Sequence, residues 1–433
     1  MAERLGIIAD DLTGANDTSA QFAGRGVISV VAFGPLDMPA TVGVVALDTD
    51  SRRADPRAAA AAAAAGARLV RTLGATRFYK KVDSTLRGHL GPELEAVMDV
   101  LGVEAALVAP AFPANGRITA GGYHLLHQVP VAESEVARDP VTPVAESRLP
   151  MLLAQSCRRR VGRVDLSILH EGLPALATEV ASLKASGVQV IACDATTDAH
   201  LELLAELLWR DETLLGCGSA GLARALAERG SGSLGGALGK ASGGSLAPAV
   251  LPGPPSGGTS FRPLFVVAGT RSRTTAAQIE AFREGGATVV PVEALDLLAD
   301  GGAELERAAA RQAAAALAAG QHTVLYLSLS SPVVQQPEAS RRLTLAMGRM
   351  AAEVLVMLGG ALPVAGLVLT GGDTAKAVCG ELGVQGIEIE RELDPAVALG
   401  RCLGGRYPGL RVVTKGGACG GPGILALAAG ELQ

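Results

Sequence analysis

The feature that most constrains this chain is the alternation of short β-rich runs with helix-like stretches along its length. In the first half, the predicted strands span 5–9, 29–33, 42–48, 78–81, 105–109 and 189–193, and the predicted helices span 14–23, 56–73 and 92–101. Strands that alternate with helices at this spacing predict a mainly parallel sheet covered by helices.

The second half repeats this alternation. Its predicted strands span 264–268, 288–291, 323–327, 367–370 and 411–413, and its predicted helices span 274–284, 305–319, 342–358 and 374–382, before a last helix. Between the halves, Gly, Ser and Pro replace the apolar pattern over residues 230–258, as in a flexible connector. We therefore predict an α/β protein with two domains, residues 1–229 and 260–433, joined by a linker over 230–259 and each built on a mainly parallel sheet flanked by helices.

The linker contains one sequence with a competing interpretation. Gly239 and Lys240 resemble the end of a phosphate-binding loop. That motif requires a glycine where this chain has Leu234, and a serine or threonine where it has Ala241. The linker interpretation is therefore favoured.

Composition narrows the class of protein. With 48% hydrophobic and 19% charged residues among 433, the chain can form apolar cores and is not disordered as a whole. The net charge of -5 and the aromatic content of 3% argue against a nucleic-acid partner. They do not exclude a small anionic ligand, because Arg and Lys can cluster locally in a chain of negative net charge. Isolated cysteines, no cationic leader before a long apolar run and no stretch of 18 apolar residues predict a cytoplasmic protein without a membrane partner, with a homo-oligomer left open.

Polar side chains follow two of the strands predicted in the first half. Asp10 and Asp11 come directly after 5–9, where ligands gather in such sheets, although Asp11 or Thr13 could simply cap the next helix. Arg52 follows 42–48 and is suited to clamp a carboxylate or a phosphate. The alternative for Arg52 is a surface ion pair with Asp50 or Asp55.

The densest polar group spans residues 80–89, after the strand at 78–81. Its lysines, Asp83, hydroxyl groups and Arg87 could hold an anion, orient sugar hydroxyls and supply a base. The histidines at 89, 124 and 127 lack metal-binding spacing, so no metal-ligating residue is predicted and His124 and His127 are expected to be ordinary polar residues near a loop.

Three glycine-bearing turns follow strands of the second half, at 269–272, 371–375 and 414–423. Glycine lets the backbone approach a ligand closely, and the N–H groups that begin a helix attract phosphate oxygens. Together the turns could cradle a nucleotide, although neither a Walker A loop nor a GxGxxG motif is present. The alternative for 371–375 is a tight turn in which Asp373 caps the helix.

Taken together, six ordered motifs resemble those of the four-carbon acid sugar kinases: residues 8–15, 48–52, 81–88, 110–117, 139–143 and 370–375. The resemblance runs from the first strand to the last helix. It implies ATP-dependent phosphorylation of a terminal hydroxyl on a short sugar acid such as threonate, erythronate or an oxo-tetronate. It also implies an N-terminal domain that holds the sugar acid, a C-terminal domain that holds the nucleotide, and a ligand site in the cleft between them.

The resemblance also assigns residues. The implied substrate contacts are Asp10, Arg52, Lys81, Val82, Asp83, Ser84 and Arg87, and the implied ATP contacts are Ser272, Gly371, Gly372, Asp373, Thr374, Gly416 and Gly417. We expect Arg52 to hold the substrate carboxylate and the region of Asp373 to hold the phosphates with Mg²⁺. Asp83 is the expected catalytic base or orienting group, with Asp10 as its competitor.

Two loops depart from the family pattern. Residues 269–272 read Gly-Thr-Arg-Ser where Gly-Ser-Cys-Ser is usual, and residues 415–420 lack the usual phenylalanine. Arg271 could add a phosphate contact. The altered loops leave open a regulatory protein that binds a sugar acid without phosphotransfer. A metal-dependent hydrolase or aldolase built on Asp10 and Asp11 is a further alternative, but it gives the 371–375 turn no role.

Overall fold

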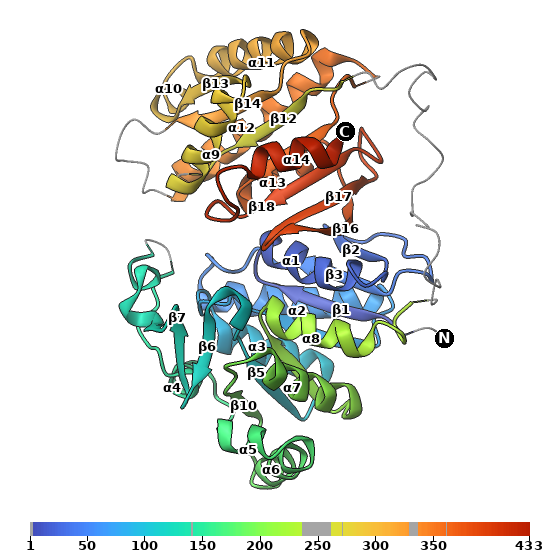
Figure 1. The fold of residues 1–433 in the computed structure, drawn as a ribbon, viewed down its shortest axis with the longest axis vertical. Coiled ribbons are helices and arrows are strands. Elements are labelled where there is room, and N and C mark those ends of the chain that lie inside the picture. The colour runs from blue at the N-terminus through green and yellow to red at the C-terminus, as the bar shows by residue number, and fades with distance from the viewer. Residues whose placement is uncertain (1–2, 140–141, 236–260, 271, 329–336, 361) are drawn as a thin grey trace. The chain divides into compact units, whose positions relative to one another are not determined.

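The chain divides into two units, residues 1–244 and 245–433. The structure is a computed structural model that describes residues 3–139, 142–235, 261–270, 272–328, 337–360 and 362–433 (Figure 1). Most of the predicted linker, with Gly239, Lys240 and Ala241, lies outside the described residues, and so does Arg271. Within the described ranges, no helix is long and apolar enough to cross a membrane.

The main sheet of the first unit contains eight described strands, all parallel to their neighbours within the unit. Their order is β2 (Ser29–Ala32), β3 (Val44–Asp48), β1 (Leu5–Ala9), β4 (Arg77–Lys81), β11 (Leu214–Gly218), β5 (Ala105–Ala109), β10 (Val190–Cys193) and β9 (Val161–Val164). Because β1 lies between β3 and β4, the loops that leave these three strands meet at one edge of the sheet.

Helices cover both faces of this sheet. On one face α2 packs against α3 and α3 against α4, and on the other α8 packs against α1 and α7. The helices are α1 (Leu12–Ala23), α2 (Pro56–Thr72), α3 (Leu90–Leu101), α4 (Leu149–Ser156), α5 (Leu166–His170), α6 (Leu173–Ala185), α7 (Asp198–Arg210) and α8 (Ala220–Gly230). A small antiparallel sheet of β6 (Arg117–Ala120), β7 (Tyr123–Leu126) and β8 (Val129–Pro130) follows β5.

Local sequence explains where the helices start and how closely they pack. Asp55 caps α2, its carboxylate accepting the N–H groups of Arg57 and Ala58, and Pro56 provides a fixed first turn. The buried positions of α2 recur at helical spacing and are small, so the helix lies close to the sheet; they are Ala59, Ala63, Gly66, Ala67 and Val70.

The second unit has a mixed sheet. Five parallel strands run in the order β13 (Thr288–Glu293), β14 (Thr323–Ser328), β12 (Leu264–Ala268), β15 (Gly366–Thr370) and β18 (Arg411–Lys415), followed by antiparallel β17 (Val397–Leu403) and β16 (Gly386–Asp394). Helices α9 (Arg273–Glu284) and α14 (Ile424–Leu432) pack together, and α12 (Pro337–Leu358) packs against α10 (Ala294–Leu298), α11 (Gly302–Ala318) and α13 (Gly372–Glu381).

The predicted fold class is confirmed as an α/β protein with mostly parallel sheets. Three predicted strands coincide with β1, β5 and β12. The prediction missed β11, which lies between β4 and β5, and the antiparallel β16 and β17. The first described residues of the predicted linker also pack on the first unit, since Leu234 is buried and pairs with Glu3.

Candidate functional site

The first candidate site lies at the carboxyl ends of β3, β1 and β4. Ala9, the last residue of β1, is in register with Asp48 on one side and Lys81 on the other. The polar residues that follow these three positions in the chain therefore converge, although they are about 40 and 70 residues apart in sequence.

Arg52 joins two carboxylates at this edge. Its Nε donates to Asp10 Oδ2 at 2.7 Å and its Nη2 to Asp10 Oδ1 at 2.9 Å. The same guanidinium donates to Asp11 at 2.8 and 2.7 Å. Asp11 also caps α1, accepting the N–H of Gly14 at 2.9 Å, so the predicted cap is confirmed alongside the ion pair.

The alternative prediction, a surface ion pair of Arg52 with Asp50 or Asp55, was wrong. Arg52 pairs with Asp10 and Asp11, while Asp55 caps α2. The side chain of Arg52 is only 15% exposed, so the pairing takes place in a largely buried environment. The backbone at Gly88 packs closely against Asp10, since a Cβ at position 88 would lie 3.2 Å from Asp10 Oδ2. Gly88 also has φ +94°, a conformation that favours glycine.

Asp83 is held by Arg87. Arg87 donates to the two oxygens of Asp83 at 2.8 and 3.1 Å, and the hydroxyl of Thr85 also donates to Asp83. Arg52 Nη2 lies 3.8 Å from Asp83 Oδ1. Arg87 Nη1 also lies 3.5 Å from Asp139 Oδ2, so Asp139, the first residue of the predicted motif at 139–143, lies at the same edge.

Neighbouring cationic side chains keep the carboxylates of Asp10 and Asp83 ionised. Burial raises the pKa of each, but Arg52 and two lysines more than offset burial at Asp10, so its pKa is lowered. At Asp83, Arg87, Arg52 and the Thr85 hydroxyl hold the pKa well below its usual range. Both groups are thus anionic hydrogen-bond acceptors at neutral pH.

The two lysines at the end of β4 have different surroundings. Lys80 is fully buried and its ammonium lies 2.8 Å from Glu93 of α3, whose side chain is 2% exposed. Lys81 donates to the carbonyl of Val82 at 2.8 Å and approaches the start of α1, since a Cβ on Gly14 would lie 2.8 Å from Lys81 Nζ. Sequence reasoning missed Glu93, because an acidic residue in a helix carries no signal of a buried partner.

His124 of β7 supports the loop that holds Ser84. Its Nε2 lies 2.9 Å from the carbonyl oxygen of Ser84, and its Nδ1 lies 2.9 Å from the hydroxyl of Thr119. A carbonyl only accepts, so Nε2 carries the hydrogen and Nδ1 accepts from Thr119. Burial lowers the pKa of His124 to about 4, which makes it neutral at pH 7.

The loop after β4 places Val82 and Ser84, the remaining predicted substrate contacts of this segment, in different surroundings. The side chain of Val82 is buried and its N–H donates to the carbonyl of Gly218 at 2.9 Å, so Val82 offers a ligand no side-chain group. Ser84 is half-buried and comes next to Asp83 in the loop. Sequence reasoning did not foresee that His124 backs Ser84, because 40 residues separate them.

The second candidate site lies at the carboxyl ends of β12, β15 and β18, which are neighbours in the sheet of the second unit. The three glycine-bearing turns therefore converge. Gly371 has φ +96°, a conformation that favours glycine, and its N–H donates to the carbonyl of Lys415 at 2.9 Å. A Cβ on Gly417 would collide with Thr270, so the first and third turns are in contact.

Asp373 does not cap α13, and that alternative was wrong. The helix starts at Gly372 with Gly371 in the capping position, so Asp373 lies in the first turn and is exposed. The N–H groups of a first turn have no acceptor within the helix and attract anions. Ser272 takes the capping position of α9, and its N–H donates to Thr270 Oγ1 at 3.3 Å.

Two residues of α9 that sequence reasoning missed hold the loop after β18. Thr275 donates its hydroxyl to the carbonyl of Gly417 at 2.7 Å. Gln278 donates its amide hydrogens to the carbonyls of Cys419, Gly420 and Gly421 at 2.8–3.2 Å. The glycine-rich loop therefore has a defined shape despite its composition.

The described residues hold no cluster of three or more His, Cys, Asp or Glu side chains that could bind a metal ion. Magnesium in nucleotide sites is commonly held by phosphate oxygens, water and one or two carboxylates. The exposed carboxylate of Asp373, beside the first turn of α13, fits that mode of binding.

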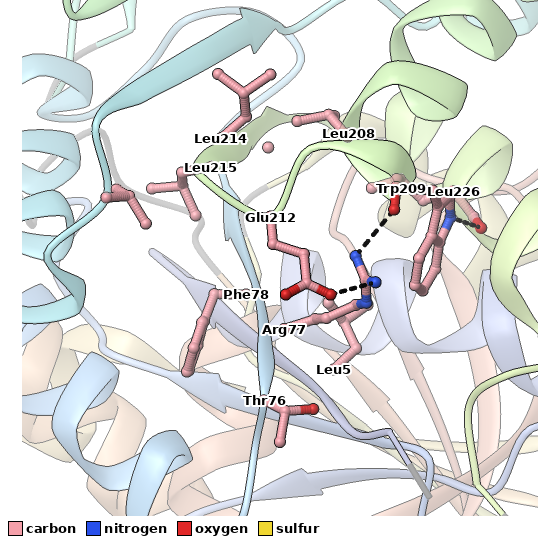
Figure 2. A pocket seen from close by; sticks show the side chains of 12 residues that line it. Leu5, Thr76, Arg77, Phe78, Leu208, Trp209, Glu212, Leu214, Leu215 and Leu226 are labelled. Atoms are coloured by element: carbon pink, nitrogen blue, oxygen red, sulfur yellow. Dashed lines mark hydrogen bonds and ion pairs between the residues drawn. The ribbon is translucent and has the colours of Figure 1, made fainter.

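A separate hollow of about 60 Å³ lies at the opposite edge of the first sheet (Figure 2). It is lined by the first residues of β1, β4 and β11, and Arg77 lies 4.5 Å over the ring of Trp209 beside it. No predicted site residue lines this hollow. Ligands of parallel sheets bind at the carboxyl ends of strands, so the hollow is not the candidate site.

Matches to two family models define a protein with one domain for a sugar and one for a nucleotide. Residues 5–226 match the model of a sugar-binding N-terminal domain, and residues 265–425 match that of a nucleotide-binding C-terminal domain. The chain belongs to the four-carbon acid sugar kinase family, and the resemblance seen in the sequence is thereby confirmed.

Similar proteins cover almost the whole chain. A D-erythronate kinase of Heliobacterium modesticaldum is 31% identical over 96% of this chain and 93% of its own length. A D-threonate kinase of Salmonella typhimurium is 32% identical over 97% of this chain and 96% of its own length. A solved structure from Salmonella typhimurium LT2 shares the fold, with a TM-score of 0.81 at 24% identity, over 99% of this chain and 100% of the other.

Proposed function

We propose that this protein transfers the terminal phosphoryl group of ATP to a terminal hydroxyl of a four-carbon sugar acid such as threonate, erythronate or 3-oxo-tetronate. The observation that carries the proposal is the pairing of a sugar-binding domain and a nucleotide-binding domain in one chain whose relatives are sugar-acid kinases. The hydrolase or aldolase alternative gives the second domain no role.

Asp10 orients the attacking hydroxyl in this proposal. Asp83 already accepts from both Arg87 and Thr85, whereas Asp10 accepts two hydrogen bonds from the part of the chain that the structure describes, both from Arg52. A carboxylate has about four acceptor positions, so Asp10 retains room for a substrate hydroxyl. Its lowered pKa suits a group that aligns the hydroxyl and receives its proton late, as the loose transition state of phosphoryl transfer requires.

The substrate carboxylate needs cationic donors at the same edge. Arg52 commits four hydrogen bonds to Asp10 and Asp11 and retains one N–H of its five. Lys81 donates to a single carbonyl among the described residues and can take a further acceptor. We therefore assign the carboxylate to Arg52 together with Lys81, with the loop of Asp83, Ser84 and Arg87 beside the sugar hydroxyls.

The nucleotide phosphates are assigned to the second site. The turn from Gly371 to Thr374 and the loop at Gly416 and Gly417 supply backbone N–H groups, and Ser272 adds a hydroxyl. Asp373 would hold Mg²⁺, which neutralises charge on the phosphate oxygens during transfer.

Because the hydroxyl and the terminal phosphate must meet, we propose that the two domains close around the reactants and exclude water. Small-angle scattering with and without both ligands would detect this closure as compaction.

An ADP-release assay tests the function across a panel of tetronates and 3-oxo-tetronates, with phosphorus NMR of the product. One acid should give ATP- and Mg²⁺-dependent ADP release and a phosphate monoester. Asp10→Asn should lose this activity, and Glu304→Gln, the same change at an exposed carboxylate of α11, should keep it. Binding of an acid without ADP release would support the regulatory alternative instead.

A further inference from the structure

Lys415, the last residue of β18, is a buried lysine with no acidic partner in the described ranges of the chain. It is 1% exposed, and its ammonium donates to the carbonyl of Gly416 at 3.0 Å and to the hydroxyl oxygen of Thr275 at 3.3 Å. Both acceptors are neutral, and no carboxylate among the described residues pairs with Lys415. A buried charge of this kind is costly unless an anion binds beside it.

Lys80 provides an internal comparison, because it is also a buried lysine near the carboxyl end of a parallel strand. Glu93 pairs with Lys80, and the pKa of Lys80 is raised although burial opposes this. Burial lowers the pKa of Lys415 to about 8. Lys80 thus has a counter-charge within its own domain, whereas no carboxylate of the described residues pairs with Lys415.

A buried hydroxyl without a hydrogen-bond partner among the described residues lies on the strand next to Lys415. Thr370 is in register with Lys415 on the adjacent strand β15, and its hydroxyl oxygen is buried with no hydrogen-bond partner among the described residues. Alternation along the strands puts both residues on the face of Val368 and Val413, which belong to one core cluster with residues of α9 and α14. Gly371 and the first turn of α13 follow Thr370 directly.

We propose that Lys415 binds the polyphosphate chain of the nucleotide, with the Thr370 hydroxyl as a neighbouring donor. This inference rests on the proposed function and adds two residues to its nucleotide site. The ammonium has three hydrogens and two neutral acceptors, so a phosphate oxygen can take the third hydrogen and supply the missing negative charge.

The elements packed around Lys415 carry few titratable groups. Helix α13, which contacts β18, carries Asp373, Lys376 and Glu381, and α14 carries Glu431. Cys419 is the one that affects the pKa of Lys415, and the packed strands contribute Thr370 of β15 and Val397 of β17. The charged residues of α9 are all exposed: Arg273, Glu280, Arg283 and Glu284. A pH dependence of nucleotide affinity between pH 7 and 9 can therefore be assigned to Lys415 once Cys419→Ser has been compared.

Calorimetry of the full-length protein with Mg·ATP, Mg·ADP and adenosine tests the inference. Lys415→Met should weaken ATP and ADP about 10- to 100-fold and leave adenosine unchanged, as expected for loss of a charged hydrogen bond. Thr370→Val should weaken ATP by less, while Thr370→Ser should not. Lys184→Met, at a lysine paired with Glu104 and Asp211 in the first domain, is the control.

The pH dependence of ATP affinity tests the inference in the wild-type protein, so this measurement does not depend on a variant that folds. ATP affinity should fall as pH rises from 7 to 9, by up to about tenfold per pH unit above the pKa, and Lys415→Arg should remove this dependence. Unchanged ATP affinity in Lys415→Met, or an equal loss for adenosine, overturns the inference while ATP binding by the wild type leaves the proposed function standing. A wild type that binds no ATP overturns the proposed function itself.

Discussion

Arg52 binds both carboxylate oxygens of Asp10, through Nε and Nη2 at 2.7 and 2.9 Å. The two residues follow adjacent parallel strands, β3 and β1, so this fork ties two loops together. Asp11 shares the same guanidinium and also caps α1. Arg52 therefore stabilises the site as well as offering a donor to substrate.

Replacing Arg52 should destabilise the first domain. Arg52→Met leaves Asp10 buried without its partner, and we expect a loss of about 3 kcal/mol in the free energy of unfolding. Adding Asp10→Asn to that variant should recover part of the loss, because the uncompensated charge is then removed. Denaturant unfolding of the two variants measures this, and a loss under about 1 kcal/mol for Arg52→Met would contradict it.

Asp10 and Asp83 should differ in their effect on turnover. Asp10→Asn keeps the shape of the side chain but removes the negative charge that orients the attacking hydroxyl and takes up its proton, so kcat should fall about 10²- to 10⁴-fold. Asp83→Asn breaks the pair with Arg87 and should act mainly on KM and stability. Steady-state kinetics decide the matter: near-normal kcat in Asp10→Asn with loss in Asp83→Asn would assign the hydroxyl to Asp83.

The sequence predicted those strands whose apolar runs are bounded by turn residues, such as β1, β5 and β12. It did not predict β11, because two of its five residues are glycines that weaken a strand pattern. In the structure, β11 pairs with β4 on one side and with β5 on the other. The strands β16 and β17 were also missed, since charged residues interrupt their apolar pattern.

Side chains at strand ends were predictable because parallel strands bring their carboxyl ends to one edge. Asp10, Arg52 and Asp83 do converge in this way. Their supporting residues were not predictable. Glu93, His124 and Gln278 act through contacts to distant backbone or side-chain atoms, and a contact of that kind leaves no periodic or spacing signal in the chain.

Protonation of His124 should destabilise the protein in mild acid. The folded-state pKa of about 4 lies below the ordinary value of 6.5, so between these pH values the unfolded chain binds a proton that the folded chain does not. Stability is therefore lost as pH falls from 6.5 to about 4, by about 3 kcal/mol in total from this group.

His124→Gln can test this assignment, since its amide can still donate to Ser84. The difference between wild-type and variant unfolding free energies should shrink or reverse as pH falls from about 6.5 to about 4, and carboxylates common to both proteins cancel in that difference. Two parallel curves over this range would show that His124 does not titrate there.

Lys80 and Glu93 should behave as one energetic unit. Lys80→Met or Glu93→Gln leaves the other group buried and unpaired, and each should cost about 3 kcal/mol or more. The double variant Lys80→Met/Glu93→Gln should cost less than the sum of the two single losses, because no uncompensated charge remains. Urea unfolding of the four proteins gives the coupling, and additive losses would argue against a dominant pair.

Replacing Gln278 should raise KM for ATP without changing KM for the sugar acid. Gln278→Leu removes the donor shared by the carbonyls of Cys419, Gly420 and Gly421, so the loop after β18 loses its anchor on α9. We expect KM for ATP to rise about tenfold, a change of about 1.4 kcal/mol, with KM for the sugar acid unchanged. Steady-state kinetics with each substrate varied in turn measure both values.

Two further variants on α9 separate the lost hydrogen bonds from other effects of substitution. Gln278→Glu has a similar shape but its carboxylate cannot donate to the carbonyls, so it should raise KM for ATP at least as much as Gln278→Leu does. Arg283→Gln is the control, because Arg283 is exposed on the same helix and pairs with Glu280 rather than with the loop. An equal rise in KM for ATP and for the sugar acid in Gln278→Leu would instead indicate that the change spreads through the whole chain.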